Sequence, residues 1–116
     1  MVLTKAAFYH TDWMKAYWAD DAVTTSLREY VEKQDNCEDI LMSFLHAHFA
    51  RIPPIFVKPE VMVDFGGSDG VSSRKGHLQY RLACVQRFNE AFGEGTLVPN
   101  DMVFQRVRPE LWDQWG

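Results

Sequence analysis

Hydrophobic side chains recur at helical spacing in three parts of the chain. In the first part, residues 11–34, the pattern is interrupted at Asp20 and Asp21. It predicts one kinked helix or two short ones, beginning at Thr11 or Asp12, because either side chain can cap a helix. We expect the aromatic residues here to pack in the core rather than to bind a ligand. The residues at helical spacing are Trp13, Met14, Tyr17, Trp18, Val23, Leu27, Tyr30 and Val31.

The second helical pattern follows a strong start signal. Asn36 is the natural N-cap, and Glu38 and Asp39 fall in the first turn, where the helix dipole favours carboxylates. Pro53 and Pro54 end the pattern, because proline cannot continue a helix. The face expected to pack carries Ile40, Leu41, Phe44, Leu45 and His48.

The third pattern predicts a helix over residues 77–92, with Gly93 as its terminator. Two stripes run along it side by side. We expect the apolar stripe to face the core, because it carries large hydrophobic side chains at helical spacing. The second stripe carries His77, Arg81 and Cys84 at i, i+4 and i+7. The apolar stripe consists of Leu78, Leu82, Val85, Phe88 and Phe92.

The remaining segments predict little regular structure. Residues 2–9 are apolar and aromatic and predict a short buried strand, and residues 55–57 predict another. Residues 59–75 contain a glycine-rich run and predict a surface loop, whereas residues 94–116 show little periodicity. The pattern as a whole predicts mainly helices with a few short strands.

Composition narrows the classes of function. With 116 residues, the chain is one domain or part of one, and its 47% apolar residues suffice for a core. The formal net charge of −4 argues against nucleic acid as the main partner. No apolar run approaches the ~20 residues that span a bilayer. The first nine residues contain Lys5 and no small-residue cleavage pattern, so they do not predict a signal peptide.

Few residues carry a chemical signal on their own. His46 and His48 point to different faces of their helix and cannot chelate one ion together. The glycine-rich run lacks the lysine of a phosphate loop, and the sequence contains no Asp-x-Asp motif. Glu38 and Asp39 form an acidic pair at a helix start, an arrangement that more often caps a helix than forms a site.

The two cysteines, Cys37 and Cys84, are either two buried thiols or one long-range disulfide, and composition leaves both open. If they pair, their Cα atoms lie roughly 5.5 Å apart. The bond would then bring two acids to an arginine, which suits a site for hydroxyls and an anionic leaving group. The simpler alternative is a structural ion pair beside a disulfide. The groups gathered would be Glu38, Asp39, Arg81 and His77.

Residues 36–45 are similar to the Asn-Cys-Glu/Asp-Asp-Ile-x-Met-Asn-Phe motif of the exostosin family, whose catalytic domain is that of glycosyltransferase family 64. Residues 1–10 resemble the strand that enters the last third of that domain, and residues 77–93 fit its later helix. The resemblance covers residues 1–93. Ser43 stands where the family usually has asparagine, and Lys5 where it usually has glycine.

The resemblance implies a GT-A fold, which belongs to the α/β fold class. It also implies transfer of N-acetylhexosamine from a UDP-sugar to a glycan acceptor, with retention, in building heparan-type chains. It implies the lumen of the endoplasmic reticulum or Golgi, with a membrane anchor outside this chain. The manganese-binding Asp-x-Asp would lie upstream of Met1. We therefore expect residues 1–116 to form one partial domain, the C-terminal, acceptor-side part, with residues 94–116 as a tail and with little activity alone.

The resemblance also assigns roles to residues. It implies a Cys37–Cys84 disulfide, Asp39 as the catalytic carboxylate and Arg81 as the group that stabilises the departing UDP. It implies that Glu38 contacts the substrate sugars, and that His77 also binds substrate. Two alternatives remain: a non-catalytic module of the same fold that binds a glycan or a partner chain of the family, and an unrelated cytosolic helical domain with reduced cysteines.

Overall fold

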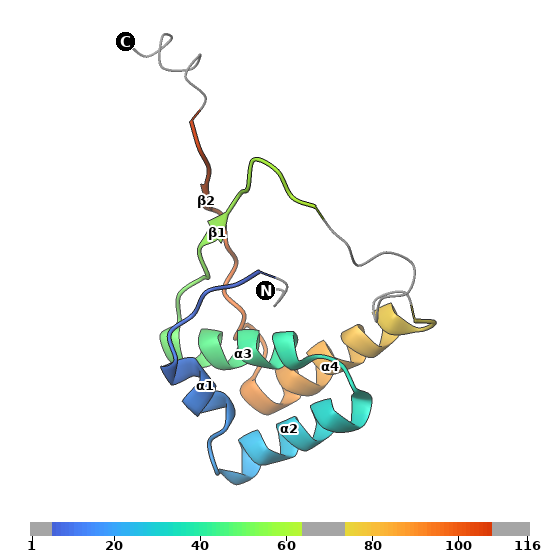
Figure 1. Ribbon diagram of the computed structural model, residues 1–116. Helices are drawn as coiled ribbons and strands as arrows, with labels where there is room; N and C mark the ends of the chain where they lie inside the picture. Colours follow the sequence, from blue (N-terminus) through green and yellow to red (C-terminus); the bar gives the residue numbers. More distant parts are fainter. Residues whose placement is uncertain (1–5, 64–73, 108–116) are drawn as a thin grey trace.

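Four helices dominate the structure, a computed structural model that describes residues 6–63 and 74–107. Helices α2, α3 and α4 each contact the other two, and α1 packs against α3 (Figure 1). The helices are α1 (Asp12–Tyr17), α2 (Ala22–Gln34), α3 (Glu38–Ala50) and α4 (His77–Phe92), and the strands are β1 (Phe56–Val57) and β2 (Val103–Phe104). The prediction of mainly helices with a few short strands is confirmed.

The core lies where α2, α3 and α4 meet. Helix α3 contributes most of it, because it contacts all three other helices and has few positions open to solvent. His48 is exposed at the edge of this face, with its ring centroid 5.3 Å from that of Phe92. The fully buried side chains are Leu27, Cys37, Ile40, Leu41, Phe44, Leu45, Cys84 and Phe88.

The first helical pattern forms two separate helices, one of the two alternatives that the sequence left open. Asp21 caps α2, since its side chain accepts a hydrogen bond from the Thr24 amide at 2.8 Å. This bond and a second one from the Thr24 side chain lower the pKa of the Asp21 carboxyl. Arg28 fixes the link between the helices by donating to the Tyr17 and Ala19 carbonyls at 2.7 and 2.9 Å.

The aromatic stripe of α1 is not core, which corrects the expectation from the sequence. None of the residues of α1 is buried, and Trp18, which follows it, is 64% exposed under the Arg28 guanidinium. Trp13 lies edge-on to His46, and Tyr17 is half-buried against the core. A helix of six residues covers only one edge of α3, so most of its side chains stay outside.

The turn between α2 and α3 also differs from the prediction. The N-cap of α3 is Cys37, with a φ of 81°, rather than Asn36. Asp35, the C-cap of α2, is also left-handed, with a φ of 50°. Such angles are uncommon for residues with a side chain. The Asn36 side chain stabilises this turn, because its Oδ1 accepts the Cys37 amide at 2.8 Å.

Helix α4 has the predicted limits but presents a different face to the core. Cys84 and Phe88 are fully buried, whereas Leu78 and Leu82 are 70% and 61% exposed. The expectation that Leu78 and Leu82 face the core is therefore wrong. The stripe that contains Arg81 and Cys84 faces α3 instead, because a disulfide and an ion pair join it to that helix.

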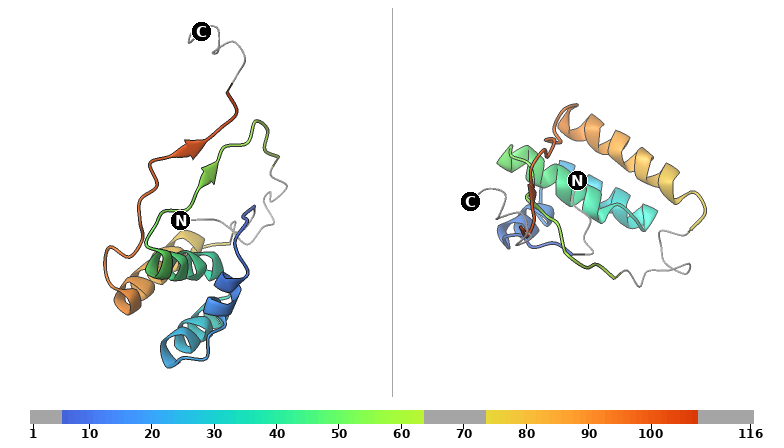
Figure 2. Two further views of the ribbon diagram at one scale, coloured as in Figure 1. Left: turned by 90° about the vertical axis from the view of Figure 1, so that its left-hand side faces the viewer. Right: turned by 90° about the horizontal axis from the view of Figure 1, so that it is seen from above.

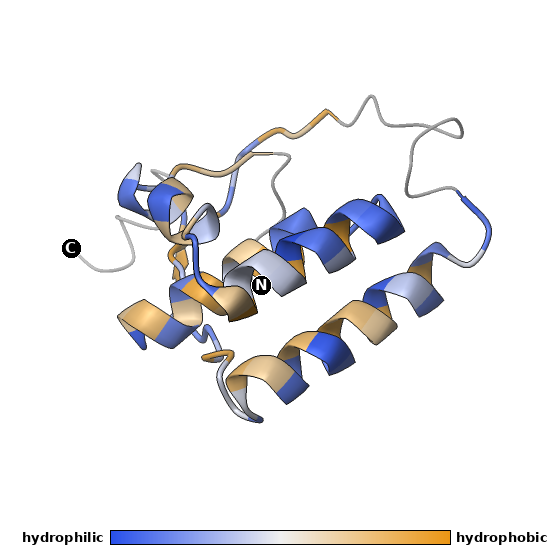
Figure 3. Cartoon of the chain, turned by 90° about the horizontal axis from the view of Figure 1, so that it is seen from below, coloured by the Kyte–Doolittle hydropathy of each residue, from blue (hydrophilic) through white to orange (hydrophobic). Residues whose placement is uncertain are grey.

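Two short parallel strands lie away from the helices (Figure 2). Phe56 pairs with Val103, and Val57 with Phe104. The prediction of a strand at residues 55–57 is confirmed in part by β1. Strand β2 lies in the tail, where no element was expected, because a strand of two residues is too short to give a periodic sequence pattern. All four residues are exposed, as are Val61, Met62 and Val63 after β1. Figure 3 colours the helices and this segment by hydropathy.

Part of the predicted N-terminal strand lies within the described residues. Residues 6–9 form no strand, and Phe8 and Tyr9 are exposed, so the expected buried strand is wrong for this part. Residues 1–5 and the glycine-rich run at 66–70 lie outside the described residues. No helix within 6–63 and 74–107 combines the length and apolar character needed to span a membrane.

Two leucines provide a test of which helix faces are buried. Leu45→Ala removes a fully buried side chain and should lower the free energy of unfolding by about 2–5 kcal/mol. Leu82→Ala, the matched control on α4, removes an exposed one and should change it by less than about 0.5 kcal/mol. Urea unfolding followed by circular dichroism measures both. Equal losses would contradict the observed orientation of α4.

Candidate active site

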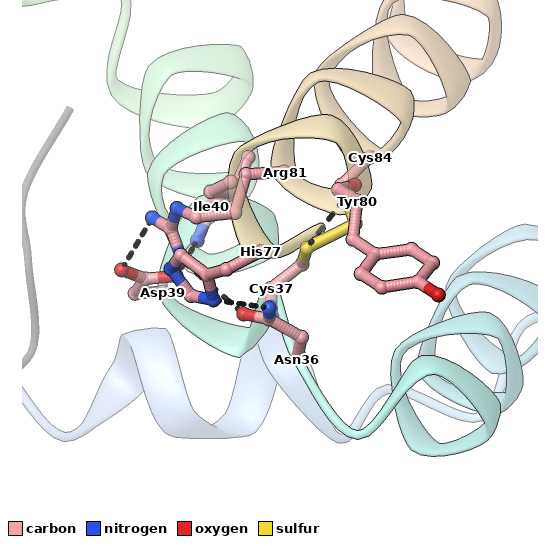
Figure 4. Close-up of a disulfide and its surroundings, with 8 residues drawn as sticks. All are labelled: Asn36, Cys37, Asp39, Ile40, His77, Tyr80, Arg81 and Cys84. Carbon is pink, nitrogen blue, oxygen red and sulfur yellow. Dashed lines mark hydrogen bonds and ion pairs between the residues drawn. A yellow bond between two sulfur atoms is a disulfide. The ribbon is translucent and has the colours of Figure 1, made fainter. Parts of the chain in front are cut away.

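A disulfide between Cys37 and Cys84 joins the start of α3 to the middle of α4 (Figure 4). Their Cα atoms lie 6.4 Å apart, and both residues are fully buried. The bond connects positions 47 residues apart in the sequence. The alternative of two free thiols does not describe this structure, and the pairing implied by the family resemblance is present.

One turn before Cys84, Arg81 forms a two-pronged ion pair with Asp39. Its NH1 donates to Oδ1 at 3.2 Å and its NH2 to Oδ2 at 2.9 Å. The side chains are only 20% and 8% exposed, so the pair is largely shielded from water. Planar fork geometry of this kind fixes the guanidinium orientation as well as its charge.

Asn36 links this ion pair to His77. Its Oδ1 lies 3.3 Å from Arg81 NH1, and its Nδ2 lies 3.2 Å from His77 Nδ1. Figure 4 shows Arg81 and Asp39 pointing toward one another, with Asn36 and His77 beside them. The cluster of Asn36, Asp39, His77 and Arg81, called the polar cluster below, therefore draws on both sides of the disulfide.

Glu38 does not join the polar cluster. It is exposed, and within the described ranges no hydrogen bond connects it to Arg81 or Asp39. Neighbouring residues on a helix point about 100° apart, so Glu38 and Asp39 cannot both face α4. Burial raises the pKa of the Tyr17 hydroxyl, and the Glu38 carboxylate raises it further. Of the four side chains expected to lie together beside the disulfide, Asp39, Arg81 and His77 do so and Glu38 does not.

The polar cluster retains hydrogen-bonding capacity for a ligand. Arg81 has five N–H donors and, within the described residues, directs three bonds to Asp39 and Asn36. Two donors have no hydrogen-bond partner among residues 6–63 and 74–107. The Asp39 carboxylate also accepts the Ile40 amide at 2.8 Å on Oδ1, which leaves acceptor capacity chiefly on Oδ2. The site can thus hold an anionic group beside one that donates a hydroxyl hydrogen.

The polar cluster offers no metal site. Among the described residues, no group of three His, Cys, Asp or Glu side chains is placed to hold a metal ion. The ligands expected for manganese would have to come from outside these residues. Manganese stays a prediction, and no step below depends on it.

Asn36 is the member of the polar cluster that the sequence did not assign to the site. Its residue type and position predicted an N-cap for α3, and an N-cap gives no reason to expect contacts with α4. One signal was available: an amide directly beside a paired cysteine offers both a donor and an acceptor at the point where the helices meet.

Two arginines provide a test of the buried ion pair. Arg81→Met leaves Asp39 shielded and unpaired, and should lower the free energy of unfolding by about 3 kcal/mol. Arg74→Met, the matched control, removes an exposed ion pair with Asp35 and should cost at most about 1 kcal/mol. Urea unfolding at neutral pH compares them. A larger loss from the Arg74 variant would contradict this account.

The disulfide provides a second test. Replacing Cys37 and Cys84 together by serine should lower the free energy of unfolding by roughly 4 kcal/mol, because the unfolded chain is no longer closed into a long loop. The parent chain should take up no alkylating reagent without a reductant and two equivalents after reduction, as read by intact mass. Two equivalents without reductant would contradict the bond.

Comparison with known proteins places this sequence in a family. The family model "Glycosyl transferase family 64 domain" matches residues 1–111. Glycosylinositol phosphorylceramide mannosyl transferase 1 of Arabidopsis thaliana is 43% identical over 88% of this chain. Exostosin-1a of Danio rerio is 36% identical over 97% of it, and an exostosin-like-3 homolog of Caenorhabditis elegans is 32% identical over 84%.

The chain spans only 29%, 15% and 12% of the lengths of these three relatives. No solved structure matches it. The family match nevertheless covers nearly the whole chain and includes both disulfide cysteines and the polar cluster. The chain therefore belongs to glycosyltransferase family 64, the family of the exostosins.

Proposed function

We propose that this chain is the acceptor-side part of a GT-A catalytic domain. In the complete domain it takes part in transferring N-acetylhexosamine from a UDP-sugar to a glycan acceptor, with retention. Membership of the family supports a glycosyl transfer reaction. The observation that carries the assignment to specific residues is the shielded Asp39–Arg81 ion pair beside the disulfide. Two Arg81 N–H groups in it have no partner among the described residues.

In the proposed reaction, the bond between the sugar's anomeric carbon and the diphosphate oxygen breaks, and its electron pair leaves with the diphosphate. The acceptor hydroxyl oxygen bonds to the same carbon from the same face, and its proton passes to a departing phosphate oxygen. Negative charge grows on the diphosphate while positive charge grows on the sugar. Fixed donors aimed at the growing negative charge lower the barrier.

Arg81 is the group that we assign to the diphosphate side. Its guanidinium is held by Asp39 and Asn36, so it need not reorganise when the charge develops. Its two unused N–H groups are suited to two phosphate oxygens. His77, held by the same Asn36, supplies a further polar group for the substrate at this place.

Asp39 and Glu38 are assigned to the sugars. The Asp39 carboxylate, held by Arg81, is assigned to the side of the growing positive charge on the sugar, and its Oδ2 accepts one sugar hydroxyl. Glu38 lies on the exposed side of the same helical turn, where a longer acceptor could reach it. No covalent intermediate is assigned to either carboxylate.

A second candidate donor comes from the plant relative, whose name describes a mannosyl transferase and which is 43% identical over 88% of the chain. Under this alternative, the polar cluster performs the same steps on an activated mannose, with a glycosylinositol phosphorylceramide as acceptor. The cluster contacts charge and hydroxyl groups that both donors share. Turnover measured with each activated sugar therefore has to distinguish the two candidates.

The rest of the proposed domain supplies the nucleotide-binding half and manganese, either from the same polypeptide or from a partner chain of the same family. We place the reaction in the lumen of the endoplasmic reticulum or Golgi, on a membrane-anchored protein, because disulfides persist in oxidising compartments. The non-catalytic alternative keeps the same surface but binds a glycan or partner without turnover.

The test replaces the matching segment of zebrafish exostosin-1a with this chain and measures release of the nucleotide from UDP-N-acetylhexosamine and from activated mannose. Arg81→Lys or Asp39→Asn should lower kcat by about 100-fold or more, because each destroys the fixed donor geometry. Arg74→Lys and Asp35→Asn, the matched exposed pair, should leave kcat unchanged.

Two outcomes would overturn the proposal. Full turnover by well-folded Arg81 and Asp39 variants would remove both residues from the reaction. Turnover by the 116-residue chain alone would show that it needs no other half. Glycan binding by a chimera that turns over no donor would favour the non-catalytic alternative.

A further inference from the structure

We propose that Asn36 is a positioning residue that fixes the neutral tautomer of His77, with the ring hydrogen on Nε2, and holds the Arg81 guanidinium in register with it. The importance of this arrangement for catalysis rests on the proposed function. The tautomer itself follows from hydrogen-bond geometry alone and can be tested on the chain as it stands.

The neighbours of the Asn36 side chain determine how its amide group is oriented. One end of it faces the Cys37 N–H at 2.8 Å and Arg81 NH1 at 3.3 Å. Both neighbours can only donate. The group at this end must therefore be the carbonyl oxygen, since an NH₂ group here would oppose two donors. Chemistry thus fixes an assignment that the similar shapes of the amide oxygen and nitrogen would leave open.

A further step follows at the other end of the amide. With Oδ1 committed, the NH₂ group faces His77 Nδ1 at 3.2 Å. An NH₂ group only donates, so Nδ1 must accept, and it cannot carry a hydrogen. In a neutral imidazole the hydrogen is then on Nε2. Within the described ranges, Asn36 is the side chain that hydrogen-bonds this ring, so no competing partner reverses the assignment.

The backbone holds Asn36 where it can act on both residues. It lies between two left-handed residues, Asp35 and Cys37, in the turn that the disulfide ties to α4. His77 and Arg81 are four residues apart on α4 and so lie on one face of it. A single amide therefore spans one helical turn of α4 and fixes two side chains at once.

The consequence for the site is a second directed donor. His77 Nε2–H and the unused Arg81 N–H groups belong to neighbouring turns on one face of α4. A diphosphate needs several donors, and a neutral imidazole in this tautomer supplies one without requiring a protonated ring. Asn36 contacts no substrate in this scheme and acts only through His77 and Arg81.

The test is heteronuclear NMR of the ring nitrogens in the ¹⁵N-labelled chain at about pH 8, above the usual histidine pKa of about 6.5. Nitrogens with and without a hydrogen resonate at distinct frequencies. His77→Gln removes one set of signals and so identifies those of His77. We expect Nδ1 without hydrogen and Nε2 with it. Hydrogen on Nδ1 in the parent chain would overturn the proposal, and this measurement requires no variant at Asn36.

Asn36→Asp is the decisive variant, because a carboxylate still accepts from Cys37 and Arg81 but offers His77 an acceptor in place of a donor. Nδ1 should then carry a hydrogen at the same pH. Asn89→Asp, which adds the same charge farther along α4, should leave the His77 signals unchanged. An Asn36→Asp chain that keeps its disulfide and helix content but leaves Nδ1 without hydrogen would also overturn the proposal.

The catalytic role has its own readout in the exostosin-1a chimera. Asn36→Asp should lower kcat by about 10-fold with an unchanged unfolding midpoint, whereas Asn89→Asp should leave kcat unchanged. An unchanged kcat would remove the catalytic role while leaving the tautomer intact. A parent chimera without activity would instead count against the proposed function, because the NMR result stands independently of turnover.

Discussion

The disulfide between Cys37 and Cys84 is the constraint on which the rest of this structure depends. It ties the first turn of α3 to the middle of α4 across 47 residues of sequence. Because Asp39 follows one cysteine closely and Arg81 precedes the other, the bond places the two partners of the buried ion pair within reach. Its position at the helix contact also explains why α4 presents its Cys84 stripe to the core.

Many large hydrophobic side chains of the described residues are exposed. Leu78 and Leu82 on α4 are exposed, and so are both strands of the parallel pair. Parallel strands normally have both faces covered by other elements. The described residues thus leave the β1–β2 pair and this face of α4 uncovered, and the relatives are several times longer than this chain.

The polar cluster combines a shielded ion pair with an amide that hydrogen-bonds two of its members. Asp39 and Arg81 pair with one another, so neither is an isolated buried charge, and within the part of the chain that the structure describes two guanidinium N–H groups have no partner. Asn36 adds direction, since its oxygen and nitrogen face different partners.

The sequence by itself predicted the limits of α4, the interruption between α1 and α2 and, through the motif around Cys37, the family. Those features depend on residues close in the chain or on a recognisable pattern. Only the tertiary structure decided that α4 turns Cys84 rather than Leu82 inward, that β2 pairs with β1, that Glu38 stays outside, and that Asn36 joins two elements rather than capping one. Contacts between residues more than 40 positions apart fixed these outcomes, and no local period encodes such contacts.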